Sequence, residues 1–123
     1  MALLINALLI GGAGAIGTLL RAGCTTLSIW WVGTGLWGTF VVNILGSFAF
    51  GGIVAFARVN TLPAEYELAL LLGLLGGFTT YSSFAFQSAQ LLSDGRIGIA
   101  LLYMLSTNTL SVLAVWAGLR LGS

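Results

Sequence analysis

Residues 76–84, with the sequence GGFTTYSSF, place glycines, hydroxyl side chains and aromatic rings in the middle of a long apolar stretch. A helix that crosses a bilayer needs about 20 apolar residues, and a break at its middle frees backbone groups that lipid cannot pair. Such a break is tolerated where it faces protein, water or an ion, so the cluster predicts an ion-binding or permeation site. The alternative is a close-packed glycine contact in which the hydroxyls bond back to the helix.

Two other stretches carry polar side chains at a spacing of four residues, which places each set on one helical face. The first set is Asn43, Ser47 and Gly51. The second is a stripe of hydroxyls made by Tyr103, Thr107 and Ser111. For Asn43 two roles stay open: an interhelical hydrogen bond worth about 0.6–2 kcal/mol, or the lining of a wet path. Two polar stripes and a broken helix together indicate a narrow pathway.

The charge content limits the function classes. The chain is 59% hydrophobic and 6% charged, whereas soluble domains carry about 25% charged residues, so we expect an integral membrane protein. All three carboxylates, Glu65, Glu67 and Asp94, fall at the ends of apolar segments. A proton-coupled exporter needs a titratable group inside the membrane, and none is available. Catalysis is not expected either, and a net charge of +1 argues against a nucleic-acid partner.

Four apolar segments account for the chain and predict an all-α domain of four transmembrane helices. They cover about residues 3–20, 37–57, 65–92 and 97–121. The third is longer than a bilayer requires and contains the glycine and threonine cluster, so we expect it to be broken at mid-membrane. In the first segment, Gly14, Gly17 and Arg21 share a face on which backbones can approach closely.

The arginines give no preferred orientation in the membrane. Four helices place Arg58 and Arg120 on one side and Arg21 and Arg96 on the other, and the positive-inside rule needs an imbalance. Copies inserted in both directions would then form an antiparallel, dual-topology dimer. Arg21 itself is interpreted either as an arginine that reaches the membrane interface or as a positive charge at an anion vestibule.

Three motifs resemble those of the small fluoride channels called Fluc or CrcB. They are GGAGAIGTLLR at residues 11–21, GTFVVNILGSF at residues 38–48 and GGFTTYSSF at residues 76–84. They occur in the family's order, and the resemblance extends over essentially the whole chain.

The resemblance implies a fluoride-selective channel that exports cytoplasmic fluoride passively, as an antiparallel homodimer in the bilayer of a bacterial cell membrane. It also implies one structural sodium ion, held by the backbone carbonyls of Gly76 and Thr79, and no organic cofactor. The ring edges of Tyr81 and Phe84 would face fluoride, since aromatic edges are electropositive. A polar track would include Asn43, Ser83, Thr107 and Ser111, with Tyr103 nearby and Arg21 near an entrance.

Two residues depart from the family pattern: Tyr81 stands where phenylalanine is usual, and Gln87 stands where glutamate is usual. Two other functions remain as alternatives. A small multidrug-resistance-type exporter also has four helices, but it needs a glutamate in its first helix, and residues 3–20 contain none. A structural membrane subunit would explain the glycine faces without any transport.

Overall fold

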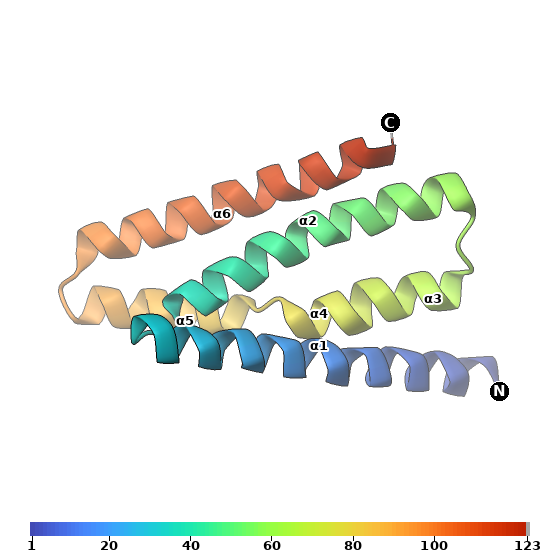
Figure 1. The fold of residues 1–123 in the computed structure, drawn as a ribbon, viewed down its shortest axis with the longest axis horizontal. Coiled ribbons are helices and arrows are strands. Elements are labelled where there is room, and N and C mark those ends of the chain that lie inside the picture. The colour runs from blue at the N-terminus through green and yellow to red at the C-terminus, as the bar shows by residue number, and fades with distance from the viewer. Residues whose placement is uncertain (123) are drawn as a thin grey trace.

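A computed structural model describes residues 1–122, which form helices joined by short loops (Figure 1). The first two helices are α1 (Ala2–Val32) and α2 (Leu36–Asn60). The third segment consists of α3 (Ala64–Leu68), the π-helix η1 (Ala69–Leu75), α4 (Gly76–Phe78) and α5 (Tyr81–Ser93). The last segment is α6 (Ile97–Leu119), followed by the short 3₁₀ helix η2 (Arg120–Gly122).

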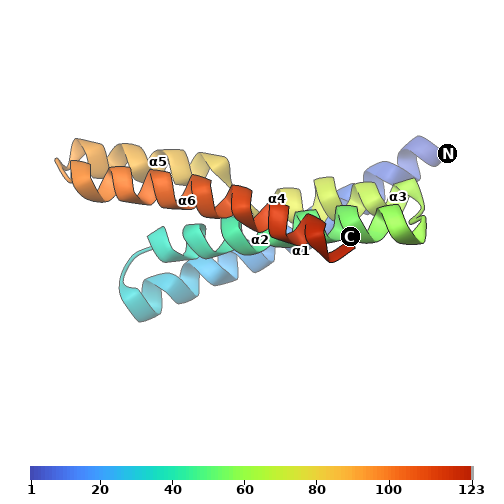
Figure 2. The ribbon, with the colours of Figure 1, turned by 90° about the horizontal axis from the view of Figure 1, so that it is seen from above.

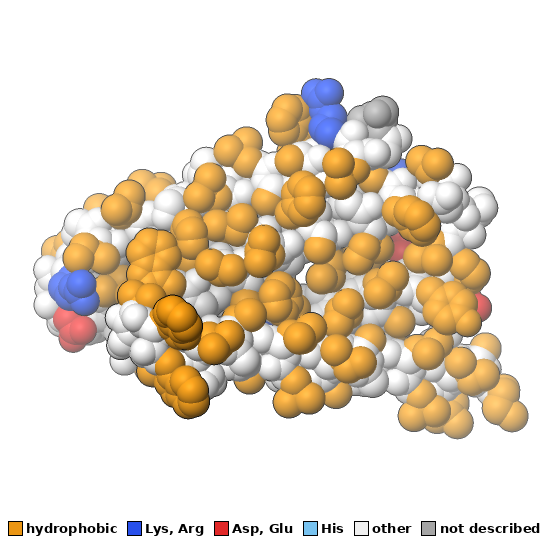
Figure 3. All heavy atoms as spheres, in the orientation of Figure 1, with side chains coloured by type: hydrophobic (Ala, Val, Ile, Leu, Met, Phe, Trp, Pro, Cys, Tyr) orange, Lys and Arg blue, Asp and Glu red, His pale blue; other side chains and the backbone are white. Residues whose placement is uncertain are grey.

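Within residues 1–122, four helical spans are long and apolar enough to cross a membrane. They are Ala2–Val32, Leu36–Asn60, Ala64–Ser93 and Ile97–Gly122. Hydrophobic side chains also spread over the whole face drawn in Figure 3, whereas a soluble monomer rarely exposes apolar patches larger than a few hundred Å². The chain is therefore an all-helical, multi-pass membrane protein.

The first helix is longer than the sequence analysis predicted. We expected it to end near Leu20, but α1 continues to Val32, and Gly33 ends it in the left-handed conformation (φ 80°) with its N–H bonded to the Ile29 carbonyl at 2.9 Å. The difference arises at Arg21, which is half-buried and donates from Nε to the Gly77 carbonyl at 2.9 Å. A charged side chain with a partner inside the fold does not have to end a helix.

Glycines let the helices cross at close range, as the sequence predicted for the face of α1 that contains Gly14 and Gly17. A β-carbon added at Gly17 would collide with the Leu74 carbonyl of η1. At the crossing of α2 and α6, one added at Gly51 would collide with the Val115 carbonyl. Where side chains are this small, backbones pack directly against each other.

The helices separate toward the loops that follow α1 and α5. In the view of Figure 2, α5 and the first half of α6 lie together, apart from the adjoining ends of α1 and α2. We call these two separated parts the α5–α6 arm and the α1–α2 arm. The N-terminus, the α2–α3 loop and the end of α6 all lie toward the opposite end of the molecule (Figures 1 and 2).

Candidate functional site

The third segment leaves helical geometry for two residues, close to the midpoint of the Ala64–Ser93 span. Thr79 (φ −82°, ψ 157°) and Thr80 (φ −150°, ψ 119°) are both extended. The Thr79 N–H still bonds to the Leu75 carbonyl at 2.9 Å and closes the last turn of α4. The N–H of Thr80 turns away, so the Gly76 carbonyl loses the partner that a continuous helix would give it.

Asn43, from α2, pairs with the backbone at this interruption. Its Oδ1 accepts from the Thr80 N–H at 2.8 Å, and its Nδ2 donates to the Thr80 carbonyl at 3.0 Å. One side-chain amide thus satisfies both polar backbone groups of an extended residue, which would be costly to leave unpaired. The interhelical hydrogen bond, one of the two roles left open for Asn43, is present in the structure.

The hydroxyls around the break also begin the next helix. Thr80 is the N-cap of α5, because its Oγ1 accepts from the Ser83 N–H at 3.2 Å. The same hydroxyl donates to the Ser83 Oγ at 3.1 Å. Thr79 donates from Oγ1 to the Leu75 carbonyl at 2.8 Å. Ser83, which the family resemblance places on the polar track, takes part in this cap.

A cavity of about 210 Å³ lies beside the break, and we call it the inner cavity. It is lined by Asn43 and Ser47 of α2, Thr79 and Thr80, Tyr81 and Phe84 of α5, and Thr107, Asn108 and Ser111 of α6. Three segments distant in sequence thus bring polar and aromatic groups together, with no charged side chain on the wall. The predicted pathway residues Asn43, Tyr81, Phe84, Thr107 and Ser111 all meet here, whereas Ser83 and Tyr103 do not line this cavity.

Two hydroxyls on the α6 side of the inner cavity have no hydrogen-bond partner among the described residues. They are the buried Oγ1 of Thr107 and Oγ of Ser111. Their neighbour Asn108 instead bonds back to the Met104 carbonyl at 2.8 Å. Buried polar groups in proteins are nearly always paired, so these two unpaired hydroxyls on one cavity wall are free to donate to a solute.

Aromatic rings form a row along the same side. The rings of Tyr81 and Phe84 are 5.6 Å apart between centroids, and those of Phe84 and Tyr103 are 5.4 Å apart. Phe84 is 5% exposed, while Tyr81 is 76% exposed in the single chain. Tyr103 donates from its hydroxyl to Oε1 of Gln87 at 2.8 Å. Gln87, noted as a departure from the family pattern, therefore positions Tyr103.

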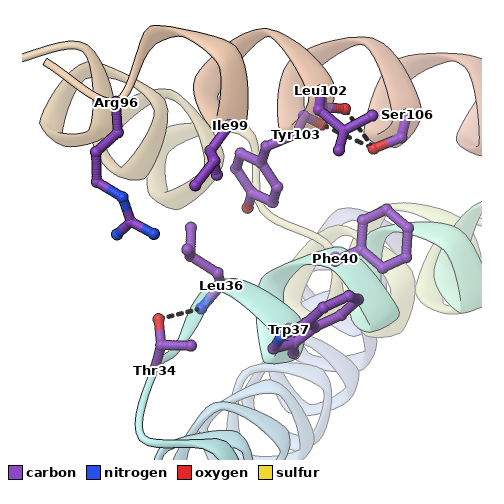
Figure 4. Close-up of a pocket in the computed structure, with 9 residues that line it drawn as sticks. All are labelled: Thr34, Leu36, Trp37, Phe40, Arg96, Ile99, Leu102, Tyr103 and Ser106. Carbon is purple, nitrogen blue, oxygen red and sulfur yellow. Dashed lines mark hydrogen bonds between the residues drawn. The ribbon is translucent and has the colours of Figure 1, made fainter.

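A second cavity, of about 360 Å³, lies nearer the loops after α1 and α5 (Figure 4). We call it the loop-side cavity. It is lined by Thr34, Leu36, Trp37 and Phe40 on one side and by Arg96, Ile99, Leu102, Tyr103 and Ser106 on the other. Arg21, placed near an entrance by the family resemblance, lines neither cavity, because its side chain is bonded to Gly77 beside the helix break.

Two backbone carbonyls at the break, those of Gly76 and Thr79, are suited to the sodium ligation that the family resemblance implies. The Gly76 carbonyl loses the Thr80 N–H to Asn43, and the Thr79 carbonyl loses the Ser83 N–H to the Thr80 hydroxyl. Carbonyl oxygens released in this way are the groups that coordinate sodium at broken membrane helices. Within residues 1–122, no cluster of three or more His, Cys, Asp or Glu side chains offers a different metal site.

Besides the contact between Arg21 and Gly77, sequence reasoning missed the cap of α5 and the contact between Tyr103 and Gln87. The cap of α5 was recognisable, since a threonine just before an apolar helical segment is an N-cap signal. The contact between Tyr103 and Gln87 had no such signal, because it depends on how closely α5 and α6 approach each other.

The four apolar spans define a multi-pass membrane protein, and its third span borders an uncharged polar cavity. The family described as CrcB-like protein, Camphor Resistance (CrcB), matches residues 8–119. The chain is 40% identical over 121 residues to the fluoride-specific ion channel FluC of Agrobacterium fabrum, covering 97% of both chains. A FluC channel of Thermus thermophilus is 40% identical over 116 residues, covering 94% of this chain and 93% of that one. This chain belongs to the CrcB family.

Proposed function

We propose that this protein is a fluoride-selective channel that lets fluoride leave the cytoplasm passively. The observation that carries the proposal is the pair of unpaired hydroxyls, on Thr107 and Ser111, in a cavity that also contains Phe84. Hydroxyls can donate to an anion, and a ring edge adds a weakly positive surface. The choice of fluoride among anions is supported by the names of the relatives.

The residues that line the inner cavity favour passive conduction over proton-coupled export. Its nine lining residues include no Asp, Glu, Lys, Arg or His. A proton-driven exporter would need a titratable carboxylate or histidine at this depth. The proposed cycle is therefore simple: an anion exchanges part of its water for hydroxyl donors and continues down its own gradient.

The functional unit in this proposal is an antiparallel homodimer. Tyr81 lines the inner cavity yet is 76% exposed in the single chain, so a second copy would enclose the side of the cavity where Tyr81 lies. Because Arg21 lies within α1, it no longer counts among the arginines at the membrane faces. Arg96 then lies on one side of the membrane, and Arg58 and Arg120 lie on the other. A difference of one charge is still a weak orientation signal.

A sodium ion is part of the same proposal. The freed carbonyls of Gly76 and Thr79, together with those of the second copy, would hold it at the centre of the dimer. The ion would supply a fixed positive charge that ties two helix breaks together. The half-buried Arg21, bonded to the Gly77 carbonyl, offsets the negative end of the first half-helix in a similar way.

Fluoride efflux from liposomes containing the purified protein, followed with a fluoride electrode, tests the function. We expect efflux driven only by the fluoride gradient, with chloride released far more slowly from matched liposomes. A requirement for a proton gradient would instead support an exporter. No efflux from correctly assembled protein would leave the structural-subunit alternative.

A further inference from the structure

The loop-side cavity has one formal charge on its wall, and that charge is positive. Arg96 precedes the first residue of α6 and extends toward Leu36 and Thr34 across the mouth of the cavity (Figure 4). No carboxylate is among the nine residues that line it. Asp94 lies in the adjacent turn, is exposed and does not line the cavity.

Three other polar side chains of the same wall, those of Thr34, Ser106 and Tyr103, already form hydrogen bonds within the chain. Thr34 accepts from the Leu36 N–H at 3.2 Å, and Ser106 donates back to the Leu102 carbonyl at 2.6 Å. The hydroxyl of Tyr103 donates to Gln87. The guanidinium of Arg96 is therefore the group of this wall best able to act on a solute, and its surroundings are mainly apolar.

The two cavities meet at one pair of rings. Tyr103 lines the loop-side cavity, Phe84 lines the inner cavity, and their ring centroids are 5.4 Å apart. A solute that reaches Tyr103 from the loop side is thus one aromatic ring away from the space that contains the Thr107 and Ser111 hydroxyls. The loop-side cavity is placed to be the aqueous approach to the inner one.

We propose that Arg96 collects small anions at the mouth of the loop-side cavity and so raises the rate at which they reach the inner cavity. The proposal rests on the proposed channel function and gives Arg96 the role that the family resemblance had assigned to Arg21. A single-sign charge beside low-dielectric walls focuses its field into the cleft, which raises the local concentration of counter-ions. The same field is screened over about 30 Å at 0.01 M salt but over only about 3 Å at 1 M.

Removing the charge at Arg96 or at Arg58 distinguishes the proposed role of Arg96 from a general effect of surface charge. Arg58 is an exposed arginine in the last turn of α2, at the opposite end of the helical bundle, and it lines neither cavity. In an antiparallel dimer each membrane face would carry both an Arg96 and an Arg58, so Arg58→Gln is a matched control. At low ionic strength we expect Arg96→Gln to slow fluoride efflux by about two- to fivefold, and Arg96→Lys and Arg58→Gln to leave it unchanged. At about 1 M of an impermeant salt the difference should disappear.

A second measurement changes the sign of the charge in one folded protein. Arg96→Cys, in a Cys24→Ser background, is assembled first and then labelled with a cationic or an anionic methanethiosulfonate. We expect faster efflux with the cationic label than with the anionic one, again only at low salt. Equal rates for the two labels, or a loss in Arg96→Gln that salt does not remove, would overturn the role of Arg96 while wild-type efflux still supported the channel. Absence of wild-type efflux would instead reject the channel function itself.

Discussion

The side chain of Asn43 makes a two-point hydrogen bond with the backbone of Thr80, accepting from its N–H at 2.8 Å and donating to its carbonyl at 3.0 Å. A residue on α2 therefore stabilises the interruption of the third segment, 37 positions away along the chain. A side-chain amide has two N–H donors and an oxygen with two lone pairs, so half of its capacity remains free beside the inner cavity. Asn43 can thus brace the break and still contact a solute.

Replacing Asn43 should destabilise the protein as well as impair transport. Asn43→Leu leaves the Thr80 N–H and carbonyl without partners, and each such group costs about 1–3 kcal/mol when buried. We expect a clearly lower midpoint of thermal unfolding in detergent and a loss of fluoride efflux, with Asn43→Asp intermediate because it keeps only the acceptor. Asn60→Leu is the control, since Asn60 is exposed and bonds to Phe56 within its own helix. Equal stability of the two leucine variants would show that the brace is unimportant.

Removing the unpaired hydroxyls should slow transport without loss of stability. Thr107→Val and Ser111→Ala each delete a buried group that has no partner among the described residues, and that deletion costs little or even stabilises. A hydrogen bond to a charged group contributes about 1.5–3 kcal/mol, so we expect efflux to fall by about tenfold or more. Ser88→Ala is the control, because this buried hydroxyl donates to the Phe84 carbonyl at 2.8 Å and lines neither cavity. Normal efflux in Thr107→Val and Ser111→Ala would remove both hydroxyls from the pathway.

Much of the architecture was accessible from sequence because hydrophobic length and small-residue spacing are local signals. The four apolar segments and the packing face of Gly14 and Gly17 follow directly from residue type. The non-helical residues, Thr79 and Thr80, lie inside the cluster at residues 76–84 that predicted a break.

The features that the sequence did not reveal depend on partners distant in the chain. The end of α1 was misplaced because Arg21 finds its acceptor, Gly77, 56 positions away. The π-helical turn of η1 has no residue signature in Ala69–Leu75, a run of leucine, alanine and glycine. The loop-side cavity exists only because the α1–α2 and α5–α6 arms separate, which no local pattern encodes.

The close crossing of α1 with the third segment gives a test of the fold that is independent of transport. In Gly17→Ala the new methyl group would collide with the Leu74 carbonyl and lie 2.9 Å from the Phe78 backbone nitrogen. Overpacking of this kind costs about 1–3 kcal/mol, so we expect a lower unfolding midpoint. Gly12→Ala, on the same helix with nothing within 4 Å of the added carbon, should be neutral. Similar midpoints for the two variants would contradict the close approach of α1 to η1 and α4.

The aromatic row gives the sharpest test of how an anion passes. Phe84 lines the inner cavity, is 5% exposed and contacts both Tyr81 and Tyr103. Phe84→Ile keeps an apolar side chain but removes the electropositive ring edge, so we expect a strong reduction in efflux. Because this side chain is also part of the core, efflux must be normalised to assembled protein. Phe86→Ile, which changes a 64% exposed ring on the same helix, should conduct normally.

Tyr81 separates the contribution of the ring from that of the hydroxyl. Tyr81→Phe keeps the ring edge at the inner cavity and should conduct normally, while Tyr81→Ile removes the ring and should be impaired if its edge contacts the anion. The measurement is the initial rate of fluoride efflux from liposomes. A large loss in Tyr81→Phe would mean that the phenol hydroxyl itself donates to the passing anion. Wild-type efflux in Phe84→Ile would reject the ring edges as anion contacts, and conduction would then rest on the hydroxyls of Thr107 and Ser111.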